Sequence, residues 1–152
     1  MKILVINGPN LNFLGIREVD VYGREDYDAL CQLIAKKAAA ENILVENFQS
    51  NYEGAIIDKI QENYYDEDLI GIVINPGAFA HYSYAIHDAL ASVPMLKVEV
   101  HISDITERAE KWRHHSVTEA ACSKLIKGHG FMGYLEAMDW LIAKEKEKSG
   151  KK

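Results

Sequence analysis

Glu99 and His101 stand two residues apart at the end of an apolar run, a spacing that suits acid–base chemistry. If the run is a strand, both side chains point to the same face, because side chains alternate along a strand. A carboxylate beside an imidazole orients the ring and favours its charged form, so the pair predicts a general acid. A metal site is the alternative interpretation, although the sequence has no HExxH or CxxC motif and no third ligand at a fixed spacing.

A second candidate for proton transfer, Tyr22, lies with Arg17 in segment 8–27, which has neither helical nor strand periodicity. A loop this long inside a compact domain is usually functional or disordered. A free phenol has a pKa of about 10, and a neighbouring guanidinium favours its ionised form. The pair could therefore act as a base on a closing loop, or the Tyr22 ring could simply anchor the loop by packing. Asn10 and Asn12 in the same loop suit tight turns as well as substrate contacts.

Further candidate site residues follow the apolar run 69–74 and the run that contains Glu99 and His101. Asn75 and then His81 come after one run, and Ile102 and Ser103 come directly after another. Backbone N–H groups that leave a strand form a nest for a carboxylate, and a serine hydroxyl adds a further donor. Ile102 and Ser103 therefore predict an anion-binding site, while Asn75 and His81 add polar groups at the same edge.

Short apolar runs alternate along the chain with stretches that repeat apolar residues at helical spacing. This alternation predicts right-handed crossovers and a parallel sheet with helices on both faces. The predicted fold class is α/β, a flavodoxin-like three-layer sandwich with a five-stranded parallel sheet, in which ligands bind beyond the carboxyl ends of the strands. The predicted strands are 3–6, 44–48, 69–74 and 96–100, with a weaker fifth near Leu125, and the predicted helices contain 30–38, 56–64, 84–89 and 134–142.

The composition fits one globular domain and narrows the classes of function. The chain has 152 residues, 48% of them hydrophobic, so 1–152 is predicted to be a single catalytic domain with 144–152 as a frayed, charged tail. A formal net charge of -6 and a pI near 5.5 disfavour general binding to nucleic acid or to an anionic membrane. Cys31 and Cys122 lie far apart and predict reduced thiols. Because no segment has the pattern of a signal peptide or a membrane span, we expect the protein in the cytoplasm.

Five blocks of the sequence occur in the order typical of one enzyme family. They are NGPNLN, the loop with Arg17 and Tyr22, FQSN, NPGA followed by His81, and EVHIS. In these blocks the chain resembles the type II dehydroquinases from end to end. The resemblance implies anti elimination of water from 3-dehydroquinate through an enolate to give 3-dehydroshikimate, in the shikimate pathway of aromatic amino acid biosynthesis or in quinate catabolism. It also implies a homo-oligomer, a dodecamer built as a tetramer of trimers, and no cofactor, metal or Schiff-base lysine.

The resemblance also assigns roles to individual residues. It implies that Tyr22 accepts the proton, that Arg17 keeps it ionised, and that Asn12 stabilises the enolate oxygen through a water. It implies that His101 protonates the departing hydroxyl while Glu99 orients the imidazole. The substrate contacts that it implies are Asn75, His81, Ile102, Ser103, Arg113 and Asp88, the last from a neighbouring subunit.

The charged stretch 104–116 departs from the family pattern. Either Arg108 or Arg113 could hold substrate oxygens there, although surface arginines are commonly only solvated. The resemblance selects Arg113. The stretch is one residue longer than the usual pattern, and Asp104 and Thr106 replace the Asn and His that are common in the family.

The main alternative function is a flavodoxin-like ligand- or phosphate-binding module. In such a module the loop after the first strand would cradle a phosphate. The loop here, Asn7-Gly8-Pro9-Asn10, matches neither GxxxxGK[ST] nor GxGxxG, and Pro9 removes a backbone donor. A signalling receiver domain would need paired acidic residues where Asn7 and Asn10 stand. The residues therefore favour the dehydratase.

Overall fold

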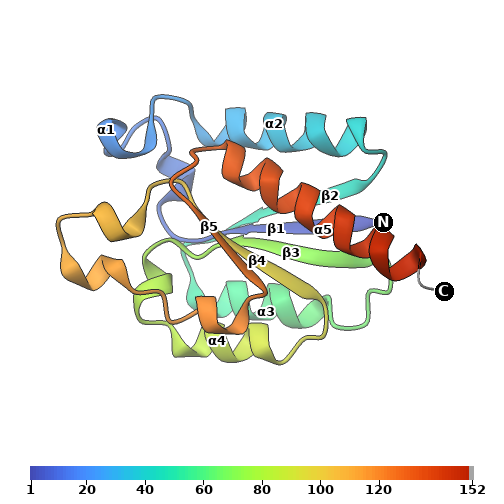
Figure 1. Cartoon of the computed structure of the whole chain (residues 1–152). Coiled ribbons are helices and arrows are strands. Elements are labelled where there is room, and N and C mark those ends of the chain that lie inside the picture. Colours follow the sequence, from blue (N-terminus) through green and yellow to red (C-terminus); the bar gives the residue numbers. More distant parts are fainter. Residues whose placement is uncertain (151–152) are drawn as a thin grey trace.

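The computed structural model describes residues 1–150, which contain one sheet of five parallel strands. The strand order is β2-β1-β3-β4-β5, and every neighbouring pair runs parallel. The chain starts in an interior strand, builds one edge of the sheet with β2, and then crosses back over β1 to build the other side (Figure 1). The strands are β1 Lys2–Asn7, β2 Leu44–Gln49, β3 Leu69–Asn75, β4 Leu96–His101 and β5 Lys124–Lys127.

The central strands form because their side chains are apolar on both faces. Ile3, Leu4, Val5 and Ile6 of β1 are all fully buried. A continuous apolar run of this kind is typical of a parallel strand that is covered by helices on both sides. The five predicted strands are confirmed, and the first four extend by one residue at one or both ends.

Helices cover both faces of the sheet, which gives three layers (Figure 1). On one face α2 and α5 enclose a core with Leu30, Ile34 and Met138, and on the other α3 and α4 enclose a core with Ile56 and Ile86. The predicted flavodoxin-like α/β sandwich is therefore confirmed. These helices are α2 Tyr27–Ala40, α3 Glu53–Glu62, α4 Tyr84–Ala91 and α5 Met132–Gly150.

Side-chain caps fix where two of the helices begin, directly after loops at the carboxyl edge of the sheet. Asp26 accepts a hydrogen bond from the Ala29 amide at 2.8 Å, at the start of α2. Ser83 accepts one from the Ile86 amide at 3.0 Å, at the start of α4. Such N-cap oxygens satisfy amides that have no partner within the helix. Both preceding loops are thus anchored at their downstream ends.

The segment 8–27, for which the sequence predicts a loop without periodicity, contains two short helical turns. They are the 3-10 helix η1 Leu11–Phe13 and the single-turn helix α1 Val19–Tyr22. One turn is too short to produce a repeating apolar pattern, so the sequence gives no sign of either. Glu18 has a left-handed φ of 38° directly before α1, and Gly23 has a φ of 87° directly after it. The other 3-10 helices are η2 Gly77–His81, η3 Ile105–Glu107, η4 Lys111–His114 and η5 Glu119–Ala121.

The apolar pattern predicts a helix that contains 134–142, and the C-terminal helix α5 extends beyond it to Gly150. The predicted frayed tail, 144–152, therefore begins within a helix, and its residues 151 and 152 lie outside the described part of the chain. None of the helices described here has both the length and the apolar character needed to cross a membrane.

Candidate active site

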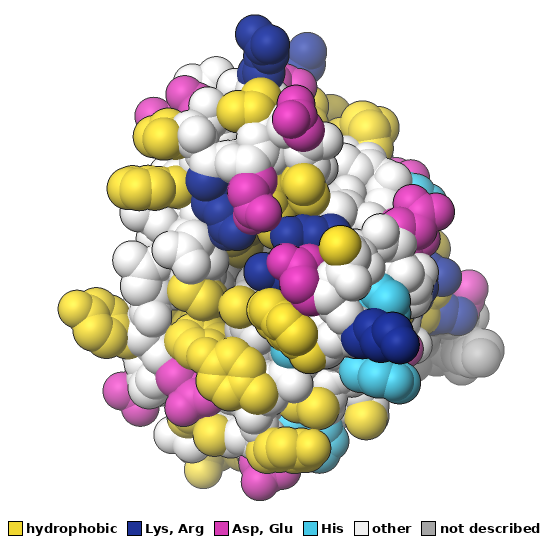
Figure 2. All heavy atoms as spheres, turned by 90° about the vertical axis from the view of Figure 1, so that its left-hand side faces the viewer, with side chains coloured by type: hydrophobic (Ala, Val, Ile, Leu, Met, Phe, Trp, Pro, Cys, Tyr) yellow, Lys and Arg dark blue, Asp and Glu magenta, His cyan; other side chains and the backbone are white. Residues whose placement is uncertain are grey.

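A cavity of about 130 Å³ opens at the carboxyl edge of the sheet, beyond the ends of β3 and β4. Figure 2 shows this edge of the molecule, where basic and acidic side chains gather around a hollow. The location agrees with the general rule for open parallel sheets. The predicted site residues that line the cavity are Arg17, Tyr22, Asn75, His81, His101, Ser103 and Arg113.

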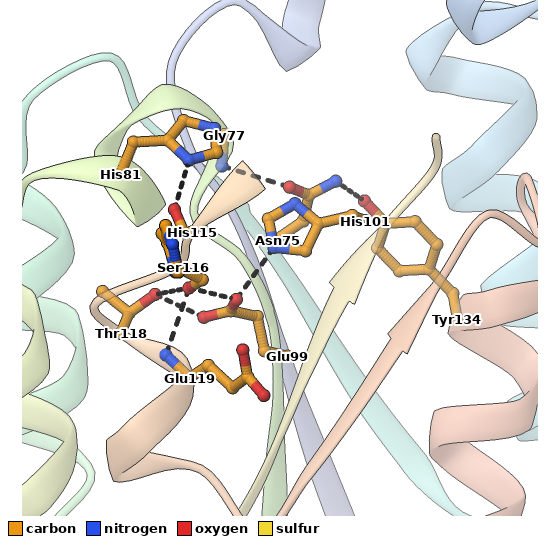
Figure 3. A network of polar contacts seen from close by, with 10 residues as sticks. All are labelled: Asn75, Gly77, His81, Glu99, His101, His115, Ser116, Thr118, Glu119 and Tyr134. Atoms are coloured by element: carbon orange, nitrogen blue, oxygen red, sulfur yellow. Dashed lines mark hydrogen bonds and ion pairs between the residues drawn. The ribbon is translucent and has the colours of Figure 1, made fainter. Parts of the chain in front are cut away.

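His101, the last residue of β4, is held by a carboxylate buried beside it. Its Nε2 atom lies 2.8 Å from Oε2 of Glu99, whose side chain is fully buried (Figure 3). Because an ionised carboxylate can only accept, Nε2 carries the proton in this contact. Nδ1 is then the ring nitrogen left to meet a ligand in the cavity. The structure brings the two side chains together as strand alternation predicts.

Two hydroxyl groups complete the surroundings of the Glu99 carboxylate (Figure 3). Ser116 donates to Oε2 at 2.5 Å, and the fully buried Thr118 donates to Oε1. Together with His101 they give the carboxylate three donors. A buried carboxylate needs such donors, because its desolvation is otherwise strongly unfavourable. The orientation of Glu99 is therefore fixed from three sides.

The Tyr22 phenol, at the end of α1, lies between two arginines. Nη1 of Arg108 donates to its oxygen at 2.9 Å, while the guanidinium of Arg17 lies over its ring, 4.8 Å from the centroid. Glu18 joins both arginines, with contacts of 2.5 Å to Arg17 and 3.3 Å to Arg108. Burial opposes the charge on Arg108, but its contacts with Tyr22, Glu18 and Glu110 raise its pKa overall, so the guanidinium stays charged. The phenol oxygen thus faces a permanent cation.

His81 and Asn75 lie on the wall of the cavity next to His101. Nδ1 of His81 is 2.7 Å from the carbonyl oxygen of His115 (Figure 3), so it carries the proton and Nε2 is left as an acceptor. Burial lowers the pKa of His81, which keeps the ring neutral. Asn75 is buried, and its Oδ1 accepts from the Gly77 amide at 3.1 Å. Both side chains are therefore fixed before any ligand binds.

The loop after β1 is braced by the end of β2. Nε2 of Gln49 lies 3.1 Å from the Gly8 carbonyl and 3.4 Å from Oδ1 of Asn12. Oδ1 of Asn51 accepts from the Asn10 amide at 3.0 Å. The FQSN block thus holds the NGPNLN block in place, which gives a structural reason for both motifs.

The sequence matches the family described as dehydroquinase class II over residues 1–142. This chain belongs to that family. Its curated relatives include the 3-dehydroquinate dehydratase of Lachnospira eligens, 59% identical over 143 residues that cover 93% of this chain and 96% of the relative. The enzyme of the same name from Bacillus cereus is 52% identical over 147 residues, which cover 96% of this chain and 98% of the relative.

Solved structures of dehydroquinases have the same fold. The type II dehydroquinase from Butyrivibrio crossotus is 60% identical, with a TM-score of 0.90 over 93% of this chain and 97% of its own. A 3-dehydroquinate dehydratase-like protein from Bifidobacterium longum is 28% identical, with a TM-score of 0.67 over 93% of this chain and 94% of its own. The resemblance found in the five sequence blocks is therefore confirmed at the level of the family.

Several residues to which the dehydroquinase resemblance assigns roles lie away from the cavity wall in this chain. Asn12 is exposed and faces Gln49. Asp88 is exposed on α4, where it contacts His87 at 2.9 Å, and Ile102 is buried behind the wall. Among residues 1–150, no three His, Cys, Asp or Glu side chains converge as a metal site requires.

Sequence reasoning missed several groups that hold the dehydroquinase site together. It left Arg108 as one of two possible substrate clamps, whereas the structure puts this arginine on the phenol oxygen of Tyr22. It gave no role to Glu18, Ser116 or Thr118. A carboxylate between two arginines of one loop is a possible signal for Glu18. The hydroxyls carry no signal, because no spacing rule connects them to Glu99.

Proposed function

We propose that this chain is a type II 3-dehydroquinate dehydratase, a hydro-lyase that converts 3-dehydroquinate to 3-dehydroshikimate and water. The observation that carries the proposal is the presence on one cavity wall of Tyr22, whose oxygen accepts from Arg108, and of His101, which is backed by buried Glu99. Membership of the dehydroquinase family and the names of its relatives support the same activity.

The substrate requires two proton transfers. It is a β-hydroxy ketone, so the hydrogens on the carbon between the ketone and the hydroxyl-bearing carbon are acidic, because their removal gives an enolate. Hydroxide is a poor leaving group and must be protonated as it departs. An enzyme therefore needs one base and one acid at separate positions. In an anti elimination the two act on opposite faces of the ring.

Tyr22 is the base in this proposal. A guanidinium that donates a charge-assisted hydrogen bond to the phenol oxygen favours the phenolate, and Arg108 does so at 2.9 Å. Arg17, over the ring face, adds a second positive charge near the enolate that forms. The phenolate removes the proton, and the electron pair of the broken C–H bond moves toward the ketone oxygen. Asn12 would act on that oxygen through a water.

His101 is the acid in this proposal. Its Nε2–H donates to Glu99, so the proton to be transferred sits on Nδ1, on a ring that the carboxylate stabilises in its charged form. Transfer of that proton to the departing hydroxyl breaks the C–O bond, and the enolate collapses to the enone. The products are enone and water. Tyr22 and His101 return to their starting states by proton exchange with solvent.

The remaining groups on the cavity wall bind the substrate in this proposal. Ser103 and the backbone beside Ile102 hold the carboxylate, and Asn75, His81 and Arg113 hold hydroxyl oxygens. The Arg113 side chain is 18% exposed and pairs with Glu110 at 3.3 Å, so it would exchange that contact for the substrate. These assignments rest on the family resemblance together with the positions of the side chains at the cavity.

We also propose that the protein assembles as a dodecamer, a tetramer of trimers, in the cytoplasm. Asp88 is 80% exposed on α4 and away from its own cavity, as a residue given to a neighbouring subunit would be. Large apolar side chains such as Tyr52, Tyr84 and Trp112 are more than half exposed, which favours their burial between subunits. Cys31 and Cys122 are free thiols, in keeping with a reducing compartment.

Ultraviolet absorbance at the enone band tests the activity. EDTA-treated protein is mixed with 3-dehydroquinate, and we expect the absorbance to rise as 3-dehydroshikimate forms. His101→Ala serves as the control and should lose most of the rise. No rise with the wild-type protein would contradict the proposal. Retention of flavin or nucleotide through gel filtration would then favour the ligand-binding module instead.

A further inference from the structure

A buried phenol, Tyr134 of α5, lies behind the cavity and contacts two asparagines at the ends of neighbouring strands (Figure 3 shows its contact with Asn75). Its oxygen is 2.9 Å from Nδ2 of Asn75, on β3, and 2.5 Å from Oδ1 of Asn7, on β1. All three side chains are at most 3% exposed. Neither Tyr134 nor Asn7 lines the cavity, and neither has a role in the proposed reaction.

The hydrogen bonds that connect Asn75, Tyr134 and Asn7 can be assigned only one set of donors and acceptors. The Gly77 amide can only donate, so Oδ1 of Asn75 must face it and Nδ2 must face Tyr134. An amide nitrogen can only donate, so the Tyr134 oxygen accepts from Asn75. The single phenol proton must then go to Oδ1 of Asn7, and the 2.5 Å separation is typical of an O–H donor. Burial raises the pKa of Tyr134, which keeps that proton in place.

These hydrogen bonds fix the orientation of the Asn75 side-chain amide. Its oxygen and one of its two amide hydrogens are already engaged within the protein, while the side chain still lines the cavity. The second amide hydrogen is the donor that remains for a ligand. Asn75 is therefore held in an orientation in which it can donate to the substrate, and a flipped amide is disfavoured at both ends.

We infer that Tyr134 is a positioning residue, which through its contacts with Asn75 and Asn7 presets the Asn75 amide to donate to a substrate oxygen. The inference rests on the proposed function for its substrate, 3-dehydroquinate. It adds α5, a helix that carries no residue of the cavity wall, to the parts of the fold that determine substrate binding.

Steady-state kinetics of Tyr134→Phe, Asn75→Ala and the double variant test the inference. Tyr134→Phe keeps the ring in the core but removes the acceptor that holds one amide hydrogen of Asn75, so the amide is held from one end only. We therefore expect KM to rise about tenfold with kcat changed much less. In the Asn75→Ala background the same change should leave KM unaltered, because no amide remains to be oriented. Tyr65→Phe is the control. It removes a phenol hydroxyl from an exposed ring that does not line the cavity, and should leave KM unchanged.

The outcomes distinguish failure of the positioning role of Tyr134 from failure of the proposed function. An unchanged KM in Tyr134→Phe, or an increase that is equal in the Asn75→Ala background, would overturn the positioning role, since mere loss of packing acts independently of Asn75. If Tyr134→Phe does not fold, Asn7→Leu tests the chain from its other end. That variant removes the acceptor of the phenol proton and should also raise KM; a wild-type KM would overturn the inference. Absence of turnover in the wild-type protein would instead overturn the proposed function.

Discussion

The two side chains proposed to transfer protons have surroundings of opposite charge. The Tyr22 oxygen faces the guanidinium of Arg108, and the His101 ring faces the buried carboxylate of Glu99. A cation beside a phenol favours loss of its proton, and an anion beside an imidazole favours its retention. The chain thus places a charge of opposite sign next to each of the two groups, which suits the proposed roles of base and acid.

Replacement of Arg108 tests the first of these charges. We expect Arg108→Gln to lower kcat by roughly 10- to 100-fold, because a partly buried, charge-assisted hydrogen bond to the phenol oxygen is lost. Arg24→Gln is the control, since Arg24 lies in the same segment as Tyr22, 8–27, but is exposed and absent from the cavity wall. Stopped-flow or steady-state measurement of enone formation gives the comparison. Equal activity of the two variants would show that Arg108 has no part in the reaction.

Among individual residues, the sequence predicted contacts between side chains that are close in the sequence and missed contacts between side chains that are far apart in it. Glu99 and His101 share a strand, so their proximity follows from the alternation of side chains. Arg108 and Tyr22 are 86 residues apart. Their contact depends on how two irregular segments fold over the sheet edge, and no periodic pattern carries that information.

At the scale of elements, the loops after β1 and β3 cross at very close range. The Gly8 amide donates to the Asn75 carbonyl at 2.8 Å, and an added Cβ at Gly8 would lie 2.3 Å from the Pro76 carbonyl oxygen. That oxygen belongs to the backbone, so it cannot move aside as a flexible side chain would. The NGPN and NPG blocks therefore need glycine at this position to approach each other.

Alanine at Gly8 should separate these two loops. We expect Gly8→Ala to lower the free energy of unfolding by about 1–3 kcal/mol through overpacking, with a loss of turnover as Asn75 shifts. Gly54→Ala is the control, because Gly54 lies in α3 with nothing within 4 Å of an added Cβ. It should leave stability unchanged or slightly higher. Urea unfolding gives the free energy of unfolding of both variants. A Gly8→Ala variant as stable as the wild-type protein would contradict the close approach of the two loops.

The segment between η4 and η5 is an element of the site although it contains no regular strand or long helix. It gives Ser116 and Thr118 to Glu99 and the His115 carbonyl to His81. Three of its residues thus anchor both histidines of the cavity. Its sequence, His-Ser-Val-Thr, has no repeating pattern, which is why its role could not be predicted.

Thr118→Val tests this anchoring with nearly unchanged volume. Because a buried carboxylate loses a donor, we expect a loss of about 1–3 kcal/mol in stability and a lower kcat. Thr106→Val removes the same hydroxyl from an exposed carboxylate contact, with Asp104, and should have a much smaller effect on both. Thermal unfolding and enone formation are the measurements. If the two valine variants behave alike, the hydroxyl of Thr118 does not support Glu99.

At the scale of the whole molecule, the fold was predictable because its signals are repetitive. Each strand gives an apolar run and each covering helix gives a stripe, so the order of elements alone implies a parallel sheet. The rule for ligand sites then identifies the carboxyl edge as the place to look. The substrate came from the resemblance alone, since neither composition nor periodicity can name a molecule.

For the whole molecule, we predict that twelve chains assemble into one particle. We expect sedimentation velocity to give a particle of about twelve times the 17.1 kDa chain. Asp88→Asn should lower activity without changing that mass, because the carboxylate is proposed to act in a neighbouring site and its side chain is 80% exposed here. A fully active particle of 17.1 kDa would contradict both the dodecamer and the role of Asp88.

The central claim is that Tyr22 removes the proton and His101 separately protonates the leaving hydroxyl. Proton NMR of 3-dehydroquinate in D₂O tests it most directly, because exchange at the acidic carbon reports enolate formation without elimination. We predict that His101→Ala exchanges that hydrogen while forming little enone, and that Tyr22→Phe, slowed by about 10²- to 10⁴-fold, does neither. Exchange at the wild-type rate in Tyr22→Phe would contradict the account.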